Sequence, residues 1–122
     1  MIRATNYWLR RLGFHVWHVP GVSRAWRFEF VDGAYLLVTD LDGYDLPDPS
    51  GPYAAVAMSS GDEVIDSEPW LGDMNELFRW FRDMLQLCSA GRNQFDIASA
   101  GIDAFKRWED RRKQMRSFLS PR

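Results

Sequence analysis

The residues most able to do chemistry are carboxylates gathered in one segment, residues 40–51, directly after an apolar stretch. This segment holds two Pro, two Gly and four acids, namely Asp40, Asp42, Asp45 and Asp48. Carboxylates this close together can ligate a cation, act as an acid and base pair, or bond to the backbone of their own loop. The Pro and Gly content predicts a solvated loop, which favours the last of these roles.

The spacing excludes a calcium site of the EF-hand type. Such a loop needs oxygen ligands at positions 1, 3 and 5, glycine at position 6 and glutamate at position 12. Counted from Asp40, the last three of these positions hold Tyr44, Asp45 and Gly51. Weak cation binding by the four Asp side chains stays an alternative, and we expect no resident metal or cofactor.

The same segment resembles the first motif of the haloacid-dehalogenase phosphohydrolases, an apolar strand followed by Asp-x-Asp-Gly. The resemblance implies a nucleophile at Asp40, a general acid at Asp42 and a hydroxyl at Ser59, at the end of a second strand. After the Gly, however, the family has Thr and an apolar residue where this chain has Tyr44 and Asp45. The gap to the next strand is also too short for the helical crossover that parallel strands need. We therefore assign no phosphohydrolase activity.

His15, His18 and Cys88 are the other candidates for reactive groups. On a strand, an offset of three places the two His on opposite faces, which argues against a shared metal ion. We expect one His to be partly buried and the other exposed, and no catalytic partner is placed beside either. Cys88 falls on the apolar face of a predicted helix and is expected to be a small core residue. As the single cysteine, it forms no internal disulfide.

Charge is distributed very unevenly along the chain. Residues 1–28 hold five Arg and no acid, residues 29–77 hold twelve acids and no Lys or Arg, and residues 78–122 hold ten basic and five acidic residues. Such a chain either pairs its own segments or presents a face of one sign to a partner. We predict that the acid-only span forms a binding face with the residues Asp40, Asp42, Asp45, Asp48, Asp62 and Glu63.

The cationic run at residues 106–116 raises the alternative of nucleic-acid binding. Two pairs spaced four residues apart, Asp103–Arg107 and Glu109–Lys113, are expected to neutralise part of it. The cations also spread over much of the helix circumference, which favours a solvated helix face. Nucleic-acid binding would require the basic N- and C-terminal segments to lie together.

The order of the helices and strands that must position these groups indicates one α+β domain spanning residues 1–122. We expect a mostly antiparallel twisted sheet of 4–5 strands, with a short N-terminal helix and two C-terminal helices packed on one face. Helices are predicted at residues 5–12, 74–90 and 94–119. Strands are predicted at residues 14–19, 25–31, 34–40, 53–59 and 63–66.

Three local patterns give this prediction its detail. The Asp32-Gly33 pair favours a two-residue hairpin turn of type I′, which opposes Phe30 to Tyr35 and Phe28 to Leu37. Asp73 is expected to cap the second helix, with Glu76 three residues on. Helical spacing assigns the last helix an apolar face of Ile97, Gly101, Ala104, Trp108, Met115 and Leu119.

No apolar run approaches the ~20 residues of a membrane span, and the N-terminus lacks the apolar stretch of a secretory signal, so we expect a cytoplasmic protein without a membrane partner. With no catalytic constellation, we favour a non-enzymatic inhibitor, immunity factor or adaptor of phage or bacterial accessory type. Its acidic face would bind a protein partner with a basic surface, in the manner of a nucleic-acid mimic. Two alternative functions stay open: a nucleic-acid binder using the basic N- and C-terminal segments, and a small enzyme whose site is assembled from distant residues. Assembly as a homodimer also stays open.

Overall fold

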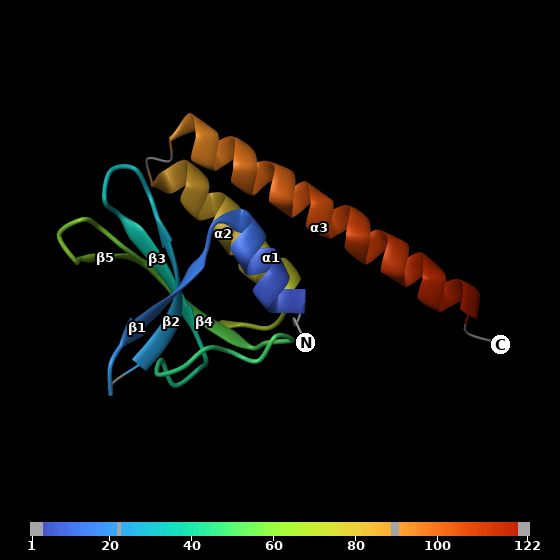
Figure 1. Cartoon of the computed structure of the whole chain (residues 1–122), viewed down its shortest axis with the longest axis horizontal. Helices are drawn as coiled ribbons and strands as arrows, with labels where there is room; N and C mark the ends of the chain where they lie inside the picture. The colour runs from blue at the N-terminus through green and yellow to red at the C-terminus, as the bar shows by residue number, and fades with distance from the viewer. Residues whose placement is uncertain (1–3, 22, 89–90, 120–122) are drawn as a thin grey trace.

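A computed structural model describes residues 4–21, 23–88 and 91–119 of the chain (Figure 1). Its five strands form one antiparallel sheet in the order β1-β2-β3-β4-β5. The elements in chain order are α1 (Ala4–Leu12), β1 (His15–Val19), β2 (Ser23–Glu29), β3 (Tyr35–Thr39), β4 (Tyr53–Met58), β5 (Val64–Leu71), α2 (Met74–Leu87) and α3 (Arg92–Leu119). The predicted α+β fold is confirmed, including its short N-terminal helix and two C-terminal helices.

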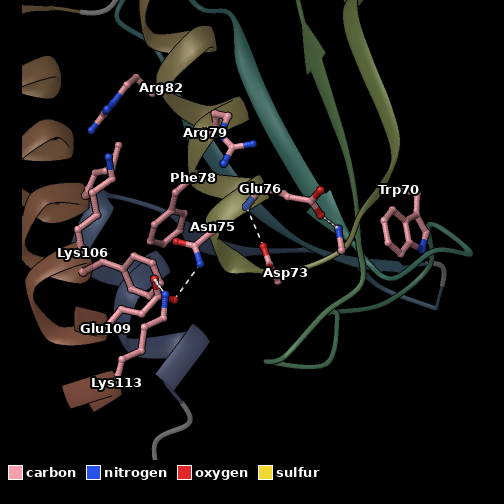
Figure 2. A pocket seen from close by; sticks show the side chains of 13 residues that line it. Trp70, Asp73, Asn75, Glu76, Phe78, Arg79, Arg82, Lys106, Glu109 and Lys113 are labelled. Carbon is pink, nitrogen blue, oxygen red and sulfur yellow. Dashed lines mark hydrogen bonds and ion pairs between the residues drawn. The ribbon is translucent and has the colours of Figure 1, made fainter. Parts of the chain in front are cut away.

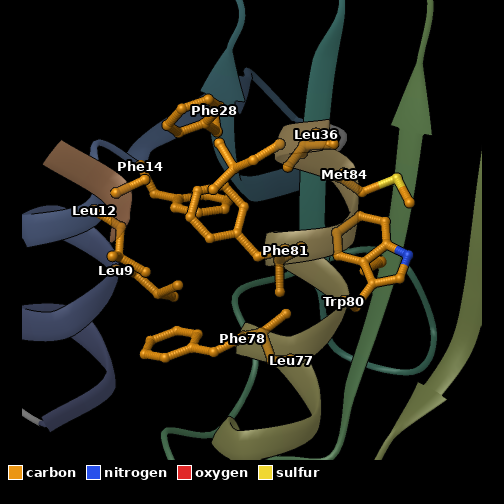
Figure 3. Close-up of a cluster of buried hydrophobic side chains, with 14 of the residues drawn as sticks. Leu9, Leu12, Phe14, Phe28, Leu36, Leu77, Phe78, Trp80, Phe81 and Met84 are labelled. Atoms are coloured by element: carbon orange, nitrogen blue, oxygen red, sulfur yellow. The ribbon is translucent and has the colours of Figure 1, made fainter. Parts of the chain in front are cut away.

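The helices cover one face of the sheet, and the core lies between them (Figures 1 and 3). Side chains alternate along β4 between buried and half-buried, as expected for a strand with one covered face. At the centre of the core, the Phe81 ring of α2 lies 5.1 Å from the rings of both Phe14 and Phe28. These aromatic contacts fix the position of α2 on the sheet.

In the described part of the chain, the opposite face of the sheet carries no helix (Figure 1). On this face the Arg27 guanidinium lies 4.0 Å from the centre of the Tyr35 ring and 5.4 Å from that of Trp17. Arg27 also forms an ion pair of 3.0 Å with Glu29. This cation is therefore engaged within its own sheet.

The turn between β2 and β3 differs from the prediction by one residue. The Phe30 N–H donates to the Ala34 carbonyl, so three residues rather than two form the loop. Only Gly33 among them has a positive φ, +94°. This is the pattern of a three-residue hairpin loop and not of type I′. The Ala34 N–H donates to Asp32 Oδ1 at 3.0 Å, which holds the longer turn in place.

This change of turn shifts the register of the hairpin. Phe28 pairs with Leu36 and Glu29 with Tyr35. The predicted pairs Phe28–Leu37 and Phe30–Tyr35 were therefore wrong. A slip of one residue moves a strand's side chains to the other face, so Leu36 enters the core in place of Leu37.

Gly33→Val is expected to lower the free energy of unfolding by about 1–3 kcal/mol, because a branched side chain is strained at this φ. A Cβ at this position would also lie 3.0 Å from the Cβ of Ser60. Urea denaturation measures the loss. Gly61, in a neighbouring turn, has ordinary φ and no contact closer than 3.8 Å, so Gly61→Val is the control. Equal losses in the two variants would contradict the strain argument.

The predicted helices form, with changes at their ends and faces. The Glu76 N–H donates to Asp73 Oδ1 at 2.9 Å, which confirms the N-cap of α2. On α3 the buried face includes Ala98 and Ile102, whereas the predicted Ile97 and Met115 are exposed. The prediction assumed contact along the whole helix, but the side chains of residues 110–116 are all exposed.

Candidate functional site

The candidate acidic residues lie on two separate surfaces. Asp40, Asp42, Asp45 and Asp48 belong to the loop before β4, while Asp62 and Glu63 belong to the turn after it. A strand of six residues spans about 20 Å, so the two groups lie at opposite ends of β4. A single partner surface would have to cover that distance to contact both groups.

Within the β3–β4 loop, an arginine is paired with one of the acids. Arg24 Nε donates to Asp45 Oδ1 at 2.7 Å. This hydrogen bond lowers the pKa of the Asp45 carboxyl and raises the pKa of the Arg24 guanidinium. Asp42, in the same loop, is exposed. The charge of the loop is thus partly neutralised by a residue of the basic N-terminal span.

The other acids mostly hold their own turns. Asp40 Oδ1 accepts the Tyr44 N–H at 3.1 Å, and Asp48 Oδ1 accepts the N–H of a serine two residues on at 2.9 Å, as expected for a loop rich in Asp. Asp62 accepts the Tyr35 hydroxyl at 2.7 Å, and this hydrogen bond raises the pKa of Tyr35. Glu63 is exposed.

The arrangement implied by the phosphohydrolase resemblance is not formed. β3 runs antiparallel to both of its neighbours. Ser59 therefore follows the end of β4 that lies away from Asp40. Its hydroxyl accepts the N–H groups of Gly61 and Glu63 at 3.2 and 3.1 Å, so it holds a turn.

His15 and His18 lie on opposite faces of β1, as predicted, but both are exposed because β1 is an edge strand. The expectation of one partly buried His was wrong. Cys88 is buried in the core, as predicted, and burial raises the pKa of its thiol. Among the described residues, no three His, Cys, Asp or Glu side chains are grouped as metal ligands would be.

The basic N- and C-terminal segments lie together, because α1 packs along α3 (Figure 1). The Trp8 ring lies 5.5 Å from that of Phe105 and 5.7 Å from that of Trp108. The two helices are in close contact at Gly101, where a Cβ would lie 2.5 Å from Leu12 Cδ2. Glycine at this position therefore permits the two helices to approach closely.

A groove of about 450 Å³ runs between α1 and α3 and is lined by three arginines and no carboxylate: Tyr7, Trp8, Arg11, Ala104, Arg107, Trp108 and Arg111. Arg11 Nη1 donates to the Tyr7 hydroxyl at 3.2 Å. Within the described chain, neither Arg107 nor Arg111 forms an ion pair. Two guanidinium groups are thus free to bind an anion.

The predicted ion pairs of α3 are half confirmed. Glu109 and Lys113 pair at 3.6 Å. Asp103 instead lies 3.7 Å from Arg82 of α2, so the expected pair with Arg107 was wrong. Asp103 therefore leaves the Arg107 guanidinium unneutralised in the α1–α3 groove.

The C-terminal part of α3 projects beyond the rest of the molecule (Figure 1). It continues the cations of the groove with Arg112, Lys113 and Arg116, all exposed. Together, α1 and residues 104–116 hold eight cationic side chains and two acids. We call Arg11, Arg107, Arg111, Arg112, Lys113 and Arg116 the α1–α3 surface.

A larger cavity, of about 770 Å³, lies on the other side of α3, against α2 and the end of β5 (Figure 2). Its lining includes cations from both helices and one exposed tryptophan: Arg79, Arg82, Lys106, Lys113 and Trp70. It also includes the carboxylates Asp73, Glu76 and Glu109. α3 therefore lines a groove on each side, one without a carboxylate and one with four cations and three carboxylates.

Models of protein families, curated proteins and solved structures were compared with the chain, and none of them matches it. None of the helices in the described part of the chain is both long and apolar enough to cross a membrane. Function must therefore be argued from the geometry and charge of these surfaces.

Proposed function

We propose that the protein binds nucleic acid through the α1–α3 surface. The observation that carries the proposal is the groove whose lining includes Arg11, Arg107 and Arg111 and no carboxylate. Guanidinium groups bind phosphate oxygens in a planar, often bidentate geometry. Three of them in one groove supply the contacts with the sugar-phosphate backbone on which affinity for nucleic acid depends.

The extended shape of the surface favours a polymeric anion. α3 has 28 residues, a length of about 42 Å at 1.5 Å per residue. Between Arg107 and Arg116, cations recur over about 14 Å of the helix axis. Nucleic acid presents charges at a comparable regular spacing along its backbone. Tyr7, exposed at the groove, offers a ring on which an unpaired base can stack, whereas the half-buried Trp108 ring is already covered by the Arg112 guanidinium at 4.8 Å.

The acidic face predicted from the sequence has less support as the working surface. Its residues divide between two ends of β4, and Asp45 is paired with Arg24. Binding of a basic protein through these residues stays a prediction. We favour the α1–α3 surface because two of its arginines have no internal ion-pair partner in the described chain.

Arg107→Gln combined with Arg111→Gln is expected to weaken nucleic-acid binding roughly tenfold at low salt. Losing two phosphate contacts should also reduce the slope of log K against log salt by about 1.8 for double-stranded DNA and about 1.4 for single strands. Fluorescence anisotropy with labelled 20-residue oligonucleotides of mixed sequence, single- and double-stranded, at several salt concentrations measures both effects.

The matched control is the double variant Arg79→Gln and Arg92→Gln, which removes the same charge from exposed residues outside the groove that form no ion pair in the described chain. Its binding should stay close to that of the parent protein. Equal losses of oligonucleotide affinity in the two double variants would show that binding depends on net charge alone, which would contradict the proposal. Binding of polyglutamate as tight as that of DNA would point instead to an acidic protein surface.

A further inference from the structure

Cations converge in the cavity between α2 and α3. Figure 2 shows the Arg82 side chain of α2 and the Lys106 side chain of α3 directed toward each other across it, with Arg79 farther along α2. Among the described residues, Arg79 and Lys106 form no ion pair, and Arg82 has only Asp103 at 3.7 Å. An anion between the helices would relieve the repulsion of these like charges.

The carboxylates of the same cavity are already bonded within the protein. Asp73 accepts the Glu76 N–H at the start of α2, and Glu76 accepts the Gly72 N–H. Glu109 accepts Asn75 Nδ2 at 2.8 Å and pairs with Lys113 at 3.6 Å. The three acids are thus engaged with groups other than Arg82 and Lys106.

β5 contributes an exposed aromatic ring to the lining of this cavity. Trp70 is 59% exposed and lines the cavity. Its ring lies over Gly72, where a Cβ would approach Trp70 Cη2 to 2.8 Å. The ring is therefore held by packing while one side stays open. A large exposed ring beside a polar cavity is suited to stack on the ring of a ligand.

We propose that this cavity is a separate site for a small phosphorylated ligand that carries an aromatic ring, with the chemistry of a mononucleotide. Its phosphate would bind Arg79, Arg82 and Lys106, and its base would stack on Trp70. The cavity volume of about 770 Å³ lies within the range of about 300–1,000 Å³ for small-molecule sites. The site goes beyond the proposed nucleic-acid binding and lies on the other side of α3. It shares no residue with the α1–α3 groove, and of the α1–α3 surface only Lys113 also lines it.

Adenosine monophosphate titrated into the full chain by isothermal calorimetry at low salt is the test. We expect one molecule to bind per chain, with ribose 5-phosphate and inorganic phosphate each binding more weakly. Arg82→Gln combined with Lys106→Gln should weaken binding at least tenfold. Trp70→Ala should reduce the affinity for adenosine monophosphate to that for ribose 5-phosphate. Arg107→Gln with Arg111→Gln, an equal change of charge in the other groove, should leave the titration unchanged.

Three results would overturn the proposal: no binding at millimolar nucleotide, inorganic phosphate binding as tightly as adenosine monophosphate, or equal losses in the two double variants. Should Arg82→Gln destabilise the chain, Lys106→Gln alone replaces the double variant, since Lys106 is exposed. Anisotropy with DNA on the same proteins separates the two sites. The α2–α3 variant should retain oligonucleotide binding and lose nucleotide binding, and the α1–α3 variant should do the reverse.

Discussion

Phe81→Ala is expected to lower the free energy of unfolding by about 3–5 kcal/mol. The ring is 0% exposed and lies 5.1 Å from both Phe14 and Phe28, so its removal leaves a cavity between α2 and the sheet (Figure 3). Small domains are stable by only about 5–15 kcal/mol, so this single change removes a large part of the margin. Urea denaturation followed by circular dichroism measures it.

The control for this prediction is Phe95→Ala, at the exposed beginning of α3. Phe95 is 39% exposed and belongs to no aromatic pair among the described residues. Its replacement should change the free energy of unfolding by less than about 1 kcal/mol. Losses of similar size in the two variants would contradict the central place of Phe81 in the core.

Gly101→Val is expected to lower the free energy of unfolding by about 1–3 kcal/mol and to weaken nucleic-acid binding without any change of charge. The new side chain would overlap buried Leu12, because a Cβ alone reaches 2.5 Å from Leu12 Cδ2. α1 would be displaced from α3, and Arg11 would move away from Arg107. Urea denaturation and the oligonucleotide titration report the two effects.

Ala100→Val is the matched control for this variant, because Ala100 is the exposed neighbour of Gly101 on the same helix. It carries the helical cost of a β-branched residue, a few tenths of a kcal/mol, without the overlap. Gly101→Val gains slightly in helix propensity, so any loss comes from packing. If Gly101→Val is destabilised but binds oligonucleotides as before, binding does not depend on the packing of α1 against α3, and this prediction is contradicted.

Most of the fold could be predicted because its signals are local. Gly13 ends α1 with a φ of +110°, and Asp73 caps α2 through a single hydrogen bond. The hairpin register could not be predicted in this way. Asp-Gly suits both two- and three-residue loops, and the choice depends on a hydrogen bond from Ala34 to Asp32 in the folded chain.

The candidate site was harder to predict than the fold. Arg11 and Arg107 are far apart in sequence, and their meeting depends on the packing of α1 against α3. The signal that could have indicated it is the small-residue series Ala98, Gly101 and Ala104, which all lie buried on α3 and permit close helix packing. The sequence also favoured a pair between Asp103 and Arg107. Tertiary packing turned Asp103 toward Arg82 instead, which no local pattern indicates.

The projection of α3 also affects how charge is distributed along the long axis of the molecule. In Figure 1 the turn with Asp62 and Glu63 lies at one end of the long axis, and the cationic end of α3 lies at the other. These two groups of opposite charge contribute a dipole moment along this axis, although the net charge of the protein is only −2. Near a polyanion the field exerts a torque that turns the α3 end forward, over a distance set by the Debye length of about 8 Å at physiological salt. For the proposed binding of nucleic acid, this torque would favour collisions in which the α3 end faces the polyanion before any side chain makes contact.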